Sequence, residues 1–134
     1  MAVLLDTNVL VWVDTADRRL GAKTRSAVEN AARSGGAFIC PISFWEVGLA
    51  VEKGRLELDT RLGVWRENLL KAGYQERAVT GADCVAMAEL VDFHADPADR
   101  LIVAVAMISA LTLVTSDRKI LSWSGALKRL DART

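Results

Sequence analysis

The chain has 134 residues, of which 51% are hydrophobic and 25% charged, a balance that suits one domain over residues 1–134 and excludes a disordered protein. Its 17 basic and 17 acidic residues cancel, so binding of nucleic acid through an overall positive field is excluded and any nucleic-acid contact must be local. The longest apolar stretch, residues 101–114, is interrupted by Ser109 and Thr112 and is shorter than the ~20 residues of a membrane helix, so no membrane partner is expected.

The first half of the chain alternates short apolar strands with helices. Apolar runs predict strands at residues 2–5 and 37–40, and Pro41 ends the second. Helical patterns, each followed by a glycine or a polar stop, are predicted at residues 7–13, 23–33, 43–53 and 60–72.

The second half continues this alternation. A polar edge strand is predicted at residues 74–79, a β-branched strand at 111–115 and a weak strand at 127–130. Helices are predicted at residues 81–91, 96–110 and 118–123. Because helices separate the strands, we predict an α/β fold whose central, mostly parallel sheet is covered on both faces.

Two cysteines, Cys40 and Cys84, occur singly in apolar segments, without the C-x-x-C spacing of a metal or redox motif. No secretory apolar region is recognisable near the N-terminus. We therefore expect reduced core cysteines in a cytoplasmic protein.

Four acidic residues lie in apolar segments, at expected strand ends or helix starts: Asp6, Glu46, Asp99 and Asp117. Ligands of open α/β sheets gather outside the carboxyl ends of parallel strands, so these acids are expected to share one edge. Crowded carboxylates repel one another unless a cation neutralises them. Hard oxygen ligands suit Mg²⁺ or Mn²⁺, and such ions activate water for phosphodiester hydrolysis.

Helix capping is the alternative explanation for each acid. Asp6 and Asp117 precede predicted helices, and aspartate is a favoured N-cap. Ser43 and Glu46 have the S-x-x-E spacing of a capping box. Asp96, followed by Pro97, is a good helix start. Capping alone does not explain why four acids share apolar surroundings on the expected ligand edge, so we favour a metal site.

Four segments together resemble the successive motifs of PIN-domain ribonucleases, in particular the VapC-type toxins of bacterial toxin–antitoxin pairs. They are residues 4–10 (LLDTNVL), 43–47 (SFWEV), 94–102 (HADPADRLI) and 115–120 (TSDRKI). Their order and spacing agree with that family over essentially the whole chain. The resemblance implies a three-layer α/β/α sandwich with a central, mostly parallel sheet, whose acids bind one or two Mg²⁺ or Mn²⁺ ions and cut single-stranded RNA.

The resemblance also implies residue roles and partners. Asp6 and Asp99 would be the primary metal ligands, and Glu46 and Asp117 would hold a water of the ion or a second ion. It further implies a homodimer and a cognate antitoxin that blocks the site. Ala98 departs from the family, which often carries an aromatic residue there, and this departure concerns packing rather than the metal ligands.

Other polar groups lie beside these acids. Asp96 matches a frequent acidic companion in the family, and we expect it to cap a helix. Several hydroxyl and amide side chains could orient the carboxylates or, equally, cap helices: Thr7, Asn8, Ser43, Thr115 and Ser116.

Basic residues also lie next to the acids. Arg100, Arg118 and Lys119 could contact phosphates, with a local ion pair from Arg100 to Asp96 or Asp99 as the alternative. His94, the single histidine, is interpreted as a hydrogen-bonding residue rather than a general base.

The chain has four tryptophans, Trp12, Trp45, Trp65 and Trp123, whose faces could stack on bases. Their apolar flanks favour the core or an interface instead. Trp65, on an amphipathic helix, is predicted to be the one that faces a partner.

Three alternatives to a nuclease differ in the residues that they require. A phosphatase of the haloacid dehalogenase type needs an acid two residues after the first-strand aspartate, where this chain has Asn8. A receiver domain needs an early acidic pair and a phosphorylatable aspartate at the end of a middle strand, which the sequence lacks. The remaining alternative is a PIN-like scaffold that binds a partner or RNA without cleaving it.

Overall fold

The computed structural model describes all of residues 1–134, and its centre is a five-stranded sheet in the order β3-β2-β1-β4-β5. Every pair of neighbouring strands is parallel, which confirms the predicted parallel sheet. The strands are β1 (Val3–Leu5), β2 (Ala37–Ile39), β3 (Gln75–Glu76), β4 (Thr112–Thr115) and β5 (Arg129–Asp131).

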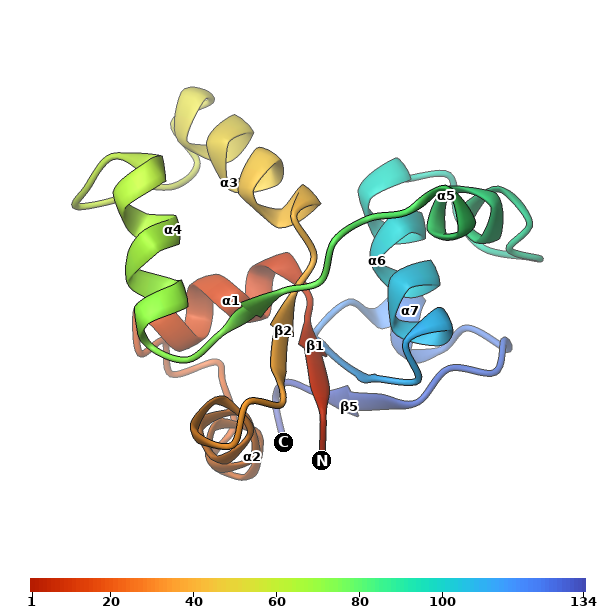
Figure 1. The fold of residues 1–134 in the computed structure, drawn as a ribbon, viewed down its shortest axis with the longest axis horizontal. Coiled ribbons are helices and arrows are strands. Elements are labelled where there is room, and N and C mark those ends of the chain that lie inside the picture. Colours follow the sequence, from red (N-terminus) through yellow and green to blue (C-terminus); the bar gives the residue numbers. More distant parts are fainter.

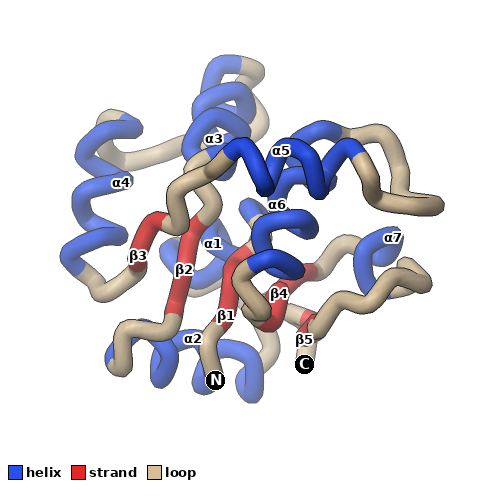
Figure 2. The backbone as a smooth tube through the Cα atoms, turned by 45° about the vertical axis from the view of Figure 1, so that its right-hand side comes forward, coloured by secondary structure: helices blue, strands red, loops and turns tan.

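Seven helices cover the sheet on both faces, as the predicted α/β/α sandwich requires (Figure 1). They are α1 (Thr7–Asp14), α2 (Ala22–Arg33), α3 (Ile42–Glu52), α4 (Leu62–Lys71), α5 (Gly81–Ala88), α6 (Pro97–Ile108) and α7 (Arg118–Leu121). In Figure 1, α3 and α4 lie to the left of the sheet and α5, α6 and α7 to the right. Figure 2 shows the strands side by side, in the order β3, β2, β1, β4 and β5 from left to right.

Alternate residues of the central strands enter two separate hydrophobic cores. Val3 and Leu5 of β1 belong to a cluster with side chains from α1, α2, α3 and α4. Leu4 belongs to a second cluster, mainly with α6, β4 and α7. Because a strand buried on both faces reads as a continuous apolar run, residues 2–5 were recognisable from the sequence.

The strand order places β1 between β2 and β4, so the chain leaves β1 in one direction and later returns to its other side. Leu5 is in register with Ile39 of β2 and Val114 of β4. At such a reversal the connections after neighbouring strands diverge and leave a crevice at the carboxyl ends. Asp6 follows β1 directly at this point.

Several predicted boundaries differ from the structure. Helix α5 ends at Ala88 rather than at residue 91, and α7 ends at Leu121 rather than at 123. The edge strand keeps only its two paired residues, and β5 begins two residues later than predicted. The residues at which helices and strands end depend on tertiary contacts, and a local sequence pattern does not reveal these contacts.

Other predictions concern the cysteines and membranes. Cys40 is buried as predicted, whereas the prediction for Cys84 is wrong, because its position on α5 faces solvent. None of the helices combines the length and apolar character that crossing a bilayer demands.

Candidate metal centre

Asp6 lies at the junction of β1 and α1, almost completely buried at 5% exposure. Its backbone N–H continues the sheet by donating to the Val114 carbonyl at 2.9 Å. The carboxylate accepts from the Thr7 N–H at 2.9 Å and from the Thr115 hydroxyl at 2.6 Å. Asp6 is thus the helix cap that the sequence predicts, but it is also a buried carboxylate with one bond to each oxygen, which leaves further lone pairs available.

Glu46 reaches the same region from α3. The Thr7 hydroxyl donates to Glu46 Oε1 at 2.5 Å, and Ser43 Oγ lies 2.8 Å from the Thr7 oxygen. Since the one hydroxyl proton of Thr7 is directed to the carboxylate, Ser43 is the donor in the second bond.

The predicted capping box of Ser43 and Glu46 is wrong. Helix α3 begins at Ile42 after Pro41, so Glu46 is the fifth residue of the helix and no longer in the first-turn position that a capping box uses. Both side chains point to Thr7 instead. This contact joins α1 to α3 beside the Asp6 carboxylate.

Asp99 occupies the first turn of α6, where Asp96 is the N-cap and accepts from the Asp99 N–H at 3.0 Å. The Asp99 side chain is not used for capping, because its Oδ2 lies 2.7 Å from His94 Nε2. The interpretation of His94 as a hydrogen-bonding residue is therefore confirmed. Asp99 Oδ1 is left without a partner in the protein.

Asp117 caps α7 through the Lys119 N–H at 2.8 Å. Its own N–H donates to Thr115 Oγ1 at 3.0 Å, and this hydroxyl is the donor to Asp6. The buried Thr115 hydroxyl thus holds both the loop after β4 and the Asp6 side chain after β1 in place.

These acids converge around Asp99. Ligand atoms of Glu46, Asp96 and Asp99 lie within 4.8 Å of one another, and so do those of His94, Asp99 and Asp117. Asp6 lies close enough to Asp99 and Glu46 for their negative charges to act on its ionisation. The structure therefore gathers Glu46 and Asp117 around Asp99, with Asp96 beside them. Asp6 lies outside both groups of ligand atoms but within electrostatic reach of Asp99 and Glu46.

The ionisation of these groups reflects burial and mutual repulsion. The pKa of Asp6 is raised to about 7, mainly by burial and also by the charges of Asp99 and Glu46, against the lowering effect of the hydrogen bonds from Thr115 and Thr7. The pKa values of Glu46 and Asp99 are also raised, in both cases mainly by burial. No lysine or arginine forms an ion pair with any of these acids.

Arg100 does not compensate this charge, although it follows Asp99 directly. Its guanidinium donates to four backbone carbonyls, those of Met87, Leu90, Phe93 and His94, at 2.9–3.2 Å. The predicted ion pair of Arg100 with Asp96 or Asp99 is therefore wrong, and its predicted phosphate contact stays a prediction. Arg118 and Lys119 are exposed and free of ion pairs.

The remaining polar candidates differ in placement. Asn8 is exposed and makes no side-chain hydrogen bond within the protein. Ser116 is buried, and its carbonyl accepts from Arg133 at 2.7 Å, a contact that no local sequence signal indicated. Phe93 was also missed; its ring stacks on His94 at 4.3 Å, and its position next to that histidine was the available signal.

The predicted exposure of the tryptophans is partly wrong. Trp65 is buried at 4% exposure and donates to Asp14, so it does not face a partner. Trp12 is also buried. Trp45, the neighbour of Glu46, is 57% exposed, and Trp123 is half-buried.

The donor set fits a divalent ion with a preference for oxygen. Both ligand groups consist of carboxylates apart from His94, whose Nε2 is engaged with Asp99, and neither contains a cysteine. Hard carboxylate oxygens select Mg²⁺ and Mn²⁺, whereas zinc sites favour nitrogen and sulfur. Several carboxylates without a lysine or arginine partner in a half-buried setting also need a cation for charge balance.

The chain is similar to known proteins over nearly its whole length. The sequence model of the PIN domain matches residues 3–123. The chain is 31% identical over 120 residues to "Ribonuclease VapC22" of Mycobacterium tuberculosis, and the match covers 90% of both proteins.

Two solved structures share the fold. A toxin–antitoxin complex from Klebsiella pneumoniae matches with a TM-score of 0.64 and 17% identity, covering 98% of each chain. VapBC2 from Rickettsia felis, bound to a DNA fragment from its promoter, matches with a TM-score of 0.69 and 18% identity over 98% of this chain and 100% of the other. Together with the match to residues 3–123, these similarities show that the chain belongs to the PIN-domain family.

Proposed function

We propose that this protein is a Mg²⁺- or Mn²⁺-dependent endoribonuclease that acts as the toxin of a toxin–antitoxin pair. The observation that carries the proposal is the convergence of Glu46, Asp99 and Asp117, with Asp6 within electrostatic reach of them, where no lysine or arginine forms an ion pair with these acids. The relative named a ribonuclease supports the reaction class, and the two complexes support an antitoxin partner.

Asp6 and Asp99 are assigned as the primary metal ligands in this proposal. When bound, one or two divalent ions would supply Lewis-acid polarisation of the phosphate and acidify a water molecule. Thr115 and Thr7 hold the Asp6 carboxylate from two sides, and His94 holds Asp99 Oδ2 so that Oδ1 faces outward unpaired. Glu46 and Asp117 are the other carboxylates of the acidic cluster.

The hydroxyl groups have a positioning role. Thr7 donates to Glu46 and receives from Ser43, and Thr115 connects Asp6 with the Asp117 backbone. Such contacts fix carboxylate orientation before a ligand binds.

The proposal extends to context and partners. We propose one PIN domain over residues 1–134, acting in the cytoplasm on RNA, and assembling as a homodimer that a cognate antitoxin inhibits. The complexes found among the structural matches support the antitoxin.

The test is sequencing of RNA 5′ ends after brief expression of the protein in a bacterial host. Wild type should create new ends at defined sites, and Asp6→Asn should not. Asp59→Asn is the matched control, because Asp59 is exposed and lies outside the acidic cluster. Absence of new ends with wild type would exclude the proposed nuclease, and the same new ends with Asp6→Asn would remove Asp6 from the mechanism.

A further inference from the structure

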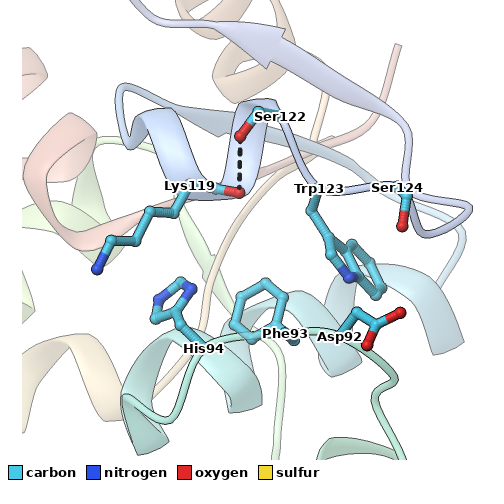
Figure 3. Close-up of a pocket in the computed structure, with 7 residues that line it drawn as sticks. All are labelled: Asp92, Phe93, His94, Lys119, Ser122, Trp123 and Ser124. Carbon is cyan, nitrogen blue, oxygen red and sulfur yellow. Dashed lines mark hydrogen bonds between the residues drawn. The ribbon is translucent and has the colours of Figure 1, made fainter.

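A cleft of about 360 Å³ opens next to the acidic cluster. Its two walls are residues 92–94, before α6, and residues 119–124, from α7 onward (Figure 3). The volume lies at the small end of the range for ligand sites, roughly 300–1,000 Å³. His94 belongs to both places, since it lines the cleft and bonds to Asp99.

Both walls of the cleft contribute aromatic rings. Phe93 stacks on His94 with ring centroids 4.3 Å apart, and Trp123 meets Phe93 edge-on at 5.2 Å. The indole N–H of Trp123 donates to the Val91 carbonyl at 2.9 Å, which holds the ring in place. Figure 3 shows the three rings side by side along the cleft. Rings held in this way lose little conformational freedom when a flat ligand binds.

The end of the cleft nearest the acids carries unpaired polar groups. The Lys119 ammonium extends toward the His94 end in Figure 3 and forms no ion pair. His94 Nδ1 has no hydrogen-bond partner in the protein, because only Nε2 is engaged. The acidic residue of the cleft, Asp92, lies at the opposite end, beside Trp123.

We propose that this cleft binds one nucleotide of single-stranded RNA adjacent to the scissile phosphate. The base packs against the Phe93, His94 and Trp123 rings, and Lys119 contacts a backbone phosphate. Aromatic faces and a cation along one groove are the features that bind single strands. The assignment rests on the proposed nuclease function, since it identifies the acidic cluster as the place where the strand is cut.

The order of groups along the cleft supports this orientation. Lys119 is two residues from Asp117 and lies at the end nearest the acids, so a phosphate beside it is close to the cleavage centre. The aromatic rings continue away from the acids toward Asp92. A strand leaving the cleavage centre therefore meets a cation first and ring faces next.

The test combines binding and cleavage of a short single-stranded RNA pool of random sequence. Binding is measured by fluorescence anisotropy in an Asp6→Asn background, and cleavage preferences by 5′-end sequencing with Asp6 intact. The variants are Lys119→Gln, Trp123→Leu and Trp123→Phe, with Lys23→Gln on α2 as the matched control for an exposed lysine. Melting temperatures show which variants are folded.

Trp123→Leu should weaken binding roughly tenfold, within the range measured for lost base stacking, and broaden the base preference at one position beside the cut. Trp123→Phe should retain most of the binding and the preference. Lys119→Gln should weaken binding and reduce the slope of the logarithm of the binding constant against the logarithm of the salt concentration by about the contribution of one phosphate contact. Lys23→Gln should leave the affinity and this slope unchanged.

The outcomes separate this inference from the nuclease proposal. Site-specific cleavage whose base preference and RNA affinity are unaffected by folded Lys119→Gln and Trp123→Leu proteins would overturn the cleft assignment alone. RNA binding that depends on the cleft, without cleavage by wild type, would overturn the nuclease proposal alone. Absence of both binding and cleavage would overturn both.

Discussion

The carboxyl group of Asp6 opposes folding when it is ionised. The side chain is almost completely buried, and its pKa is raised to about 7, above an ordinary value of 3.8, mainly by burial. Below about pH 4 the group is protonated in the folded and the unfolded chain alike. As the pH rises from about 4 to 7, only the unfolded chain loses this proton freely, so the metal-free native state loses stability.

Asp6→Asn should therefore stabilise the metal-free protein at pH 8 and have little effect at pH 4. The amide keeps an oxygen for the Thr7 N–H and removes the negative charge beside Asp99 and Glu46. Each unit of pKa shift corresponds to about 1.4 kcal/mol, so a gain of roughly 1–3 kcal/mol is expected at pH 8. Thermal unfolding in chelator at the two pH values is the measurement; a lower melting temperature for the variant at pH 8 would contradict the assignment.

The single hydroxyl group of Thr115 donates to the Asp6 carboxylate and accepts from the Asp117 N–H. Thr115→Val keeps the shape but removes the bond that lowers the Asp6 pKa, so Mn²⁺ binding at pH 7 should weaken in addition to a stability loss of about 1 kcal/mol. Thr24→Val is the control, because Thr24 is equally buried and its hydroxyl bonds to the Asp131 carbonyl. Calorimetric titration should show weaker Mn²⁺ binding only for Thr115→Val, and equal affinities would remove Thr115 from the site.

Side-chain partners were the least predictable part of the site. The sequence indicated that Glu46 and Arg100 lie near the acids, but their partners come from remote segments. Glu46 bonds to Thr7, and Arg100 bonds to carbonyls of the segment between α5 and α6. Local spacing contains no information about such contacts, so the only side-chain partners it suggested within the protein were sequence neighbours.

Helices and strands were more predictable than their ends. The starts of α1, α6 and α7 were recognisable because each follows an aspartate that caps it. The start of α3 was misplaced by one residue, since Pro41 itself occupies the N-cap position. This start places Glu46 beyond the first turn, which rules out the capping-box alternative and agrees with its predicted place among the acids.

The segment between α5 and α6 is held mainly by Arg100. Its guanidinium satisfies carbonyls at the end of α5 and in the following turn, and the His94 ring lies in the same turn. The early end of α5 at Ala88 accompanies this arrangement, because the chain must turn to direct these carbonyls inward. Arg100 thus positions the elements that carry His94 and Asp99.

Arg100→Met should destabilise the protein by roughly 2–4 kcal/mol, because it leaves several backbone carbonyls without their charged donor. Arg118→Met, at an exposed position free of ion pairs, should change stability by less than about 0.5 kcal/mol. Urea unfolding of both variants is the measurement. Equal stability of Arg100→Met and wild type would show that these bonds do not hold the segment.

The molecule as a whole explains why the acids meet. Parallel strands place all their carboxyl ends on one edge, and the order β2-β1-β4 puts the reversal of direction at β1. This consequence of topology was predictable from the alternation of strands and helices, even though the order of the strands was not.

Mn²⁺ should stabilise the native protein in a pH-dependent manner. A ligand at 100 times its dissociation constant adds about 2.7 kcal/mol to folding stability, which corresponds to a rise of roughly 10 °C in melting temperature for a chain of this size. At pH 5.5 the rise should shrink, because Asp6, with a pKa of about 7, must lose its proton to bind. An unchanged melting temperature at saturating Mn²⁺ and pH 8 would favour a scaffold without catalysis.

The central claim is that acids from separate elements form one divalent metal site. The most direct measurement is an anomalous difference map from a crystal grown at pH 8 with Mn²⁺. A peak bonded to Asp6 and Asp99, with Glu46 and Asp117 around it, is the predicted result. Mn²⁺ bound only elsewhere, with these four carboxylates free of the ion at saturating concentration, would contradict the account.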